Sequence, residues 1–193
     1  MKLLNLFRNL FLIALITQLS ACAAVAVGGV AATGTAAADR RTTGTLVEDQ
    51  TIEVKAYKAL KADAELNEQA HLNVTSYNTV VLLSGETPTD AMRQRAMEIV
   101  KGIDKVTHVY NELSIAAPSS MVSRSSDSYI TTKVKTKLFA DKKISGIQVK
   151  VNTEKGVVYL MGIVSRAEAE IATDIARQTG GVQKVVKLFQ YTD

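Results

Sequence analysis

Cysteine and histidine are scarce in this chain, and their scarcity restricts the chemistry it can perform. The sequence of 193 residues holds one cysteine, Cys22, and two histidines, His71 and His108. One cysteine excludes an intramolecular disulfide framework and a cysteine-based zinc site. Neither histidine stands in a catalytic motif, and the glycines do not follow a phosphate-binding pattern. We therefore expect a protein that is not an enzyme and that uses no cofactor and no metal.

The first 22 residues have the layout of a secretory signal. Lys2 and Arg8 precede an apolar run over residues 10–16, and this run is too short to span a bilayer. The run ends at Leu19-Ser20-Ala21-Cys22, which resembles the signal of bacterial lipoproteins. The resemblance implies that residues 1–21 are a signal peptide and that Cys22 becomes the first residue, acylated with fatty acids such as palmitate. The alternative is an ordinary signal peptide that contains a cysteine.

The same resemblance predicts where the protein is anchored. Residue 23 is alanine rather than aspartate, which in the sorting pattern of Gram-negative lipoproteins implies the outer membrane and its periplasmic face. Each buried methylene contributes about 0.8 kcal/mol and one chain anchors only marginally, so the three chains typical of such lipoproteins imply a stable anchor. Residues 22–44 are mostly Ala, Gly, Thr and Val, and this composition predicts a flexible tether.

The rest of the chain is an internal repeat. Residues 72–85 match residues 149–162 at an offset of 77, and a stretch over 116–126 has the composition of a linker. We therefore predict a first domain over 45–115 and a second over 127–193. The two differ in charge, because the first holds 7 basic against 11 acidic residues and the second holds 11 against 7. Such asymmetry indicates that they have different partners.

Each copy reads as helix, strand, strand, helix, strand. Ile130, Val134 and Leu138 recur at helical spacing, whereas Val149 and Val151 alternate with polar residues as in a strand buried on one face. A strand-helix-strand connection places its two strands parallel. The predicted fold class is therefore α+β, with two tandem copies of a three-stranded mixed sheet that carries two helices on one face.

Caps and glycines mark the ends of these elements. Ser165 and Glu168 form a capping box for the second helix of the second copy, and Pro88 is predicted at the first helical position of its counterpart. Gly85 and Gly162 occupy equivalent positions at strand ends. We assign both glycines a structural role, because only glycine permits certain backbone angles or a close approach.

The repeat resembles a known family in three segments, Ser128–Val134, Val157–Gly162 and Val109–Glu112. These segments look like the BON domain, and two copies behind a lipoprotein signal resemble the dual-BON outer-membrane lipoproteins. The resemblance implies binding of anionic phospholipid, such as phosphatidylglycerol or cardiolipin, through the second domain. It also implies support of outer-membrane integrity.

The first helix of the second copy carries the candidate site. With Ile130 facing the core, the opposite face presents two aromatic residues and two threonines, bordered by lysines on both sides, as in an interfacial membrane helix. The corresponding positions in the first copy, Thr51 and Lys61, are not aromatic. The predicted phospholipid-binding residues are Tyr129, Thr132, Lys133, Lys135, Thr136 and Phe139.

Other interpretations stay open at this point. Tyr129 and Phe139 would also be explained by packing against the other domain or by capping the helix ends. The protein as a whole would alternatively be an interaction module that docks on outer-membrane assembly proteins, or a purely structural stress protein. Nucleic acid is excluded as a partner by the predicted compartment.

Overall fold

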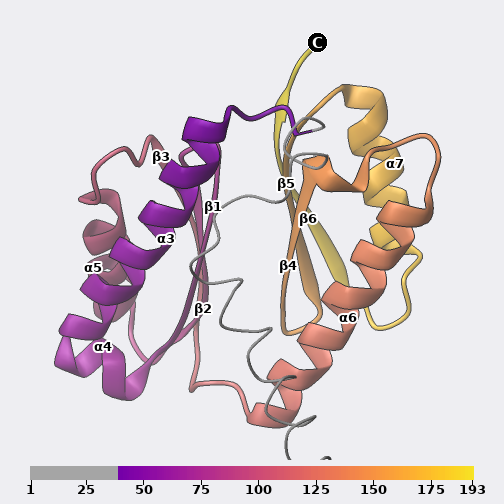
Figure 1. Ribbon diagram of the computed structural model, residues 1–193. Helices are drawn as coiled ribbons and strands as arrows, with labels where there is room; N and C mark the ends of the chain where they lie inside the picture. Colours follow the sequence, from indigo (N-terminus) through magenta and orange to yellow (C-terminus); the bar gives the residue numbers. More distant parts are fainter. Residues whose placement is uncertain (1–38) are drawn as a thin grey trace, which may run out of the picture. The chain divides into compact units, whose positions relative to one another are not determined.

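Both halves of the chain fold into the predicted order of elements in the computed structural model, which describes residues 39–193 (Figure 1). The first domain contains α3 (Thr43–Ala62), α4 (Ala64–Gln69), β1 (His71–Tyr77), β2 (Val80–Thr87), α5 (Asp90–Lys101) and β3 (His108–Ile115). The second contains α6 (Met121–Ala140), a 3-10 turn η1 (Gly146–Gln148), β4 (Val149–Glu154), β5 (Val157–Val164), α7 (Arg166–Arg177) and β6 (Lys184–Tyr191). No helix within residues 39–193 has the length and apolarity to cross a membrane.

The two sheets have the same topology. In each, the first two strands pair antiparallel and the second and third pair parallel, in the orders β1-β2-β3 and β4-β5-β6. Helices α3 and α5 cover one face of the first sheet, and α6 and α7 cover one face of the second (Figure 1). The predicted α+β class, with a mixed sheet and two helices on one face in each copy, is confirmed. Helix α4 is an addition that the repeat did not predict.

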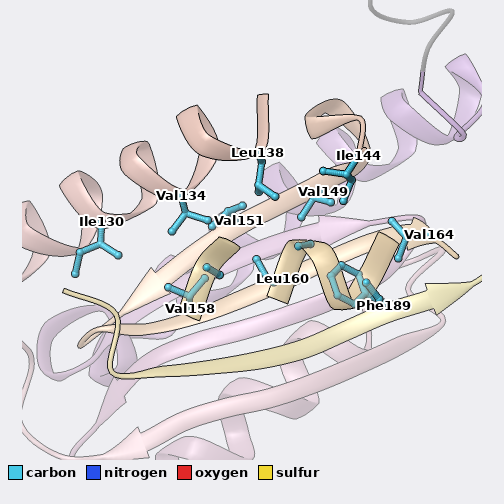
Figure 2. Close-up of a cluster of buried hydrophobic side chains, with 13 residues drawn as sticks. Ile130, Val134, Leu138, Ile144, Val149, Val151, Val158, Leu160, Val164 and Phe189 are labelled. Carbon is cyan, nitrogen blue, oxygen red and sulfur yellow. The ribbon is translucent and has the colours of Figure 1, made fainter. Parts of the chain in front are cut away.

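The apolar helical stripes form the cores, as their spacing predicted. Ile130, Val134 and Leu138 point from α6 toward the sheet in Figure 2 and are at most 5% exposed. They meet alternate residues of β5 such as Val158 and Leu160, because side chains on a strand point to one face at every second position. Burying each such aliphatic side chain contributes about 1.5–3 kcal/mol. The first domain repeats the arrangement with its own stripe, Ile52, Ala56 and Leu60.

The opposite faces of the two sheets pack against each other. A third apolar cluster takes members from both domains, namely Tyr77, Leu82, Tyr159, Met161 and Leu188. The Tyr77 hydroxyl donates a hydrogen bond to the Gln148 carbonyl at 3.2 Å, so its polar end is satisfied within the interface. The two small domain cores are thus joined by a shared apolar cluster that stabilises both. Burial in this interface raises the pKa of Tyr159 to about 12.

The predicted tether and the predicted linker both overlap the start of a helix. Helix α3 begins at Thr43 rather than after residue 44, and α6 begins at Met121 inside the predicted linker 116–126. The cause is local capping: the Thr42 and Ser120 side chains each accept a hydrogen bond from the backbone N–H three residues on. These first turns contain Gly, Thr and Ser, which are typical of linkers. The sequence therefore did not indicate where the two helices begin.

Of the two predicted helix starts, that of α7 is confirmed and that of α5 is not. The capping box of Ser165 and Glu168 is present at the start of α7. Pro88, however, is not the first residue of α5, because the N-cap is Thr89, whose side chain accepts from the Met92 N–H. Proline instead lies two residues before the helix, between the strand and the cap.

Gly85 and Gly162 occupy equivalent places opposite the first strand of their sheets. Gly85 pairs with Leu72 and has φ of +121°, and a Cβ there would collide with the His71 carbonyl oxygen. At Gly162, a Cβ would collide with the Gln148 carbonyl oxygen. The close neighbour is therefore backbone at the start of the paired strand β1 for Gly85, and backbone at the end of η1, just before β4, for Gly162.

Candidate functional site

The outer face of α6 presents its aromatic side chains to solvent. Tyr129 is 65% exposed and Phe139 is 61% exposed, while Ile130, Val134 and Leu138 are buried on the opposite side. Neither aromatic ring is buried against the first domain, which was one of the alternatives. Exposing large apolar side chains to water is unfavourable, so a group of them on one helix face is typical of a contact surface.

The threonines of this face keep their hydroxyls within the helix. Thr132 donates to the Ser128 carbonyl and Thr136 donates to the Thr132 carbonyl, both at 2.9 Å. Such bonds to the preceding turn satisfy the hydroxyl hydrogen locally. The polar part of each threonine is thereby engaged with the backbone, which makes the strip between the two aromatic residues less hydrophilic.

Met121 and Val122 extend this face and are not among the site residues predicted from the sequence. They are 75% and 81% exposed and belong to the first turn of α6. Val122 lies seven residues before Tyr129, which places both on the same side of the helix. This seven-residue spacing is the sequence signal for Val122, and the linker-like composition of residues 116–126 obscures it. We call the exposed residues Met121, Val122, Tyr129, Thr132, Thr136 and Phe139 the outer face of α6.

The lysines around the outer face differ in their roles. Lys133 Nζ donates to the Gly180 carbonyl at 2.8 Å and lies 5.2 Å from the centre of the Tyr129 ring. Lys137 Nζ donates to the Gln178 carbonyl at 3.3 Å. Both carbonyls follow the end of α7, where unpaired backbone oxygens attract cations. Lys133 and Lys137 therefore tie α6 to α7, whereas the predicted site residue Lys135 is exposed beside the outer face.

Helix α3 of the first domain also exposes apolar residues. Val47, Val54 and Tyr57 are 62%, 47% and 59% exposed. The first domain therefore also exposes an aromatic ring. Comparison of the equivalent positions Thr51 and Lys61 did not reveal it, because Tyr57 occupies a different position on the helix. The charges of the helices do differ: α6 carries four basic residues and one acidic residue, whereas α3 carries three of each. Of these two helices, only α6 combines its apolar face with a basic surplus.

A polar pocket that is open to solvent lies beside α6, where β1 meets the second domain. A cavity of about 510 Å³ is lined by residues that include His71, Arg124, Lys135 and Glu154. Burial raises the pKa of Glu154 above its ordinary value, while the Asn73 amide opposes this shift and the nearby Glu86 adds to it. Burial and then the positive charge of Arg124 lower the pKa of His71. His71 Nε2 lies 3.9 Å from Glu154, and this contact is an ion pair only when the imidazole is protonated.

Comparison with known proteins shows the family. A model described as the BON domain matches residues 48–117 and 126–193, so the chain carries two BON domains and belongs to this family, whose related proteins are not enzymes. It is 41% identical over 175 residues to the outer membrane lipoprotein DolP of Haemophilus influenzae, with 91% of each chain covered. It is also 40% identical to a 21 kDa hemolysin of Actinobacillus pleuropneumoniae, with 79% of each covered. Identity to the osmotically-inducible protein Y of Escherichia coli is 33%, over 74% of this chain and 72% of that protein.

These similarities confirm the predicted resemblance and the predicted outer-membrane lipoprotein class. The predicted attachment residue, Cys22, lies outside the described residues 39–193. Its acylation stays a prediction, as does the role of each residue on the outer face of α6.

Proposed function

We propose that this lipid-anchored protein binds anionic phospholipid, such as phosphatidylglycerol or cardiolipin, through the outer face of α6, and that it thereby supports outer-membrane integrity. The observation that carries the proposal is the exposure of four large apolar side chains along one helix with a basic surplus, namely Met121, Val122, Tyr129 and Phe139. An interfacial helix buries such a face at the boundary between headgroups and acyl chains.

The two kinds of side chain contribute different free energies. An aromatic or aliphatic group that leaves water contributes about 1.5–3 kcal/mol, largely independent of salt. A lysine near an anionic surface contributes about 1 kcal/mol, and this attraction is screened beyond roughly 10 Å at 0.1 M salt. The outer face therefore supplies the larger and salt-resistant part, with Lys135 adding a salt-sensitive part.

The proposed anchor and the outer face act together. Residues 23–38 number 16, and a chain of that length reaches at most about 55 Å when fully extended. The acyl group on Cys22 would hold the folded part within this distance of the membrane. A second, weak contact then becomes effectively intramolecular, so α6 needs only modest affinity of its own.

The test is co-sedimentation of the full chain, without its signal and with Cys22→Ala, on phosphatidylglycerol vesicles. Phe139→Glu should weaken binding about tenfold or more, because it removes an inserting ring and adds a repelled charge. Tyr57→Glu is the matched control, since Tyr57 on α3 is 59% exposed and Phe139 is 61% exposed. Binding of Phe139→Glu at the parental level would overturn the proposal, whereas an equal loss in both variants would assign the contact to both helices.

A second candidate function concerns the first domain. Val47, Val54 and Tyr57 form an exposed apolar group on a helix without a basic surplus, which favours a protein partner over an anionic lipid. Outer-membrane assembly proteins are the partners named by the alternative interpretation of the sequence. Crosslinking in cells from position 57, compared with position 139, distinguishes the two: protein adducts from 57 and lipid adducts from 139 would assign one partner to each domain.

A further inference from the structure

A buried carboxylate of the first domain holds the segment that leads into α6. Glu86 lies in β2 and is 1% exposed. It accepts a hydrogen bond from the Ser119 backbone N–H at 3.1 Å, and it forms an ion pair with Lys155 Nζ at 3.1 Å. Ser119 immediately precedes the N-cap of α6, and Lys155 lies in the turn between β4 and β5. One side chain therefore connects β2 to both the start of α6 and a hairpin of the second domain.

Ser119 is bound on its other side as well. Its carbonyl accepts hydrogen bonds from Arg124 Nε at 3.1 Å and Nη2 at 2.8 Å. Arg124 belongs to α6, so Ser119 is held between the first domain and the helix. Met121 and Val122 follow within three residues, in the turn that the Ser120 side chain caps. The direction in which this first turn presents its two apolar side chains thus depends on where Ser119 is held.

We propose that Glu86 is a positioning residue for the outer face of α6, so that the first domain orients the lipid contact made by the second. This inference rests on the proposed function, because it states what sets the membrane-facing direction of Met121 and Val122. A carboxylate buried this deeply is tolerated only when its partners compensate for lost hydration. Its two partners are Ser119 in the linker and Lys155 in the hairpin. Together these contacts define one arrangement of the first turn of α6.

The chain offers a matched control for this role. Glu53, also in the first domain, accepts a hydrogen bond from the Ser76 backbone N–H at 2.8 Å and pairs with Lys150 Nζ at 2.6 Å. It therefore makes the same two kinds of contact as Glu86, including an ion pair to the second domain. Ser76, however, lies in β1 and not in the segment before α6. A general loss of contact between the domains should affect both variants, whereas loss of positioning should affect only Glu86→Leu.

Because the sequence contains no tryptophan, a single introduced one reports its own surroundings. Val122→Trp and Phe139→Trp place a reporter at either end of the outer face in the full, unlipidated chain. On phosphatidylglycerol vesicles we expect both emissions to shift to the blue. Adding Glu86→Leu should abolish the shift at 122, preserve it at 139 and lower vesicle affinity about tenfold, as for the loss of one inserting apolar group. Glu53→Leu should leave both shifts in place.

Hydrogen exchange without vesicles tests the positioning by itself. Glu86→Leu should accelerate exchange of the amides of residues 119–123, and Glu53→Leu should not. If Glu86→Leu loses cooperative melting, Lys155→Met takes its place, since it removes one partner of Glu86 while the Lys155 backbone stays. A parental shift at 122 that survives these substitutions, or unchanged exchange, would overturn the positioning role alone. Absence of any shift in the two reporters would overturn the lipid-binding function and this role with it.

Discussion

Asp49 and Asp127, which lie 78 positions apart, hold the hairpin turn of their own domains in the same way. Asp127 accepts hydrogen bonds from both backbone N–H groups of the β4–β5 turn, those of Lys155 and Gly156, each at 2.9 Å. Asp49 accepts from the N–H groups of Asn78 and Thr79 in the β1–β2 turn, each at 2.8 Å. All four turn residues have positive φ, so each turn points its two amides toward the helix.

Asp127→Ala should destabilise the protein by about 1–3 kcal/mol, because it leaves two turn N–H groups without an acceptor. Asp49→Ala should cost more, since Asp49 also binds the Ser76 hydroxyl and Arg41. Urea unfolding monitored by circular dichroism measures both. Asp174→Ala is the control, because Asp174 is an exposed residue of α7 that pairs only across one helical turn with Arg177. Equal effects of all three substitutions would contradict the assigned role.

Glu154→Gln should stabilise the protein at neutral pH, and the gain should shrink as the pH falls. The pKa of Glu154 is raised in the folded state, chiefly by burial. The stability linked to this group is therefore fully present below its unfolded pKa and is lost as the pH rises through the folded value. Substitution by the neutral amide removes that loss. The urea midpoints of variant and parent, compared at pH 7 and pH 4.5, check this.

His71→Asn should have the opposite pH dependence. The pKa of His71 is lowered from 6.5 in the folded state, first by burial and then by Arg124. The stability linked to this group is present above the unfolded pKa and is lost as the pH falls through the lowered value. The variant should therefore lose less stability than the parent between pH 7 and pH 5. A parallel decline of both proteins over that interval would count against a neutral His71 at pH 7.

Lys135→Ala should weaken vesicle binding mainly at low salt, because its contribution is a screened attraction. Its melting temperature should stay close to that of the parent, since Lys135 is exposed. Lys133→Ala should in addition lower the melting temperature, because it removes the bond to the Gly180 carbonyl. Co-sedimentation between 50 and 500 mM salt, with a melting curve for each variant, separates these effects. Equal melting temperatures would show that the bond to α7 contributes nothing measurable.

Cys22→Ala should abolish acylation and release the protein from the outer-membrane fraction. The expectation follows from the segment that ends at Cys22, since the acyl chains supply the stable part of the anchor. Mass spectrometry of the mature protein and membrane fractionation measure it. The idea fails if the variant fractionates like the parent and the two show no acyl mass difference.

The local features of the fold could be predicted because their causes are local. The stripe of Ile130, Val134 and Leu138 is buried wherever this segment is helical, since its spacing matches the helical repeat. The capping box at Ser165 needs only residues three apart. Because the chain contains an internal repeat, each element predicted in one copy also predicts its counterpart in the other. The exposure of Tyr129 and Phe139 also followed from the helical period, once the buried side was known.

The rest depended on contacts between segments that are distant in the sequence. Nothing near Glu86 in the sequence indicates that it binds Ser119 and Lys155, because these contacts exist only when the second sheet lies against the first. The same holds for Lys133, which lies beside the outer face as the helical wheel predicts but whose ammonium group also donates to the Gly180 carbonyl after α7. Periodicity determined which side of each helix is buried. Only tertiary packing decided which of the remaining polar groups are free and which are held, because a hydrogen bond needs a partner that the local sequence does not supply.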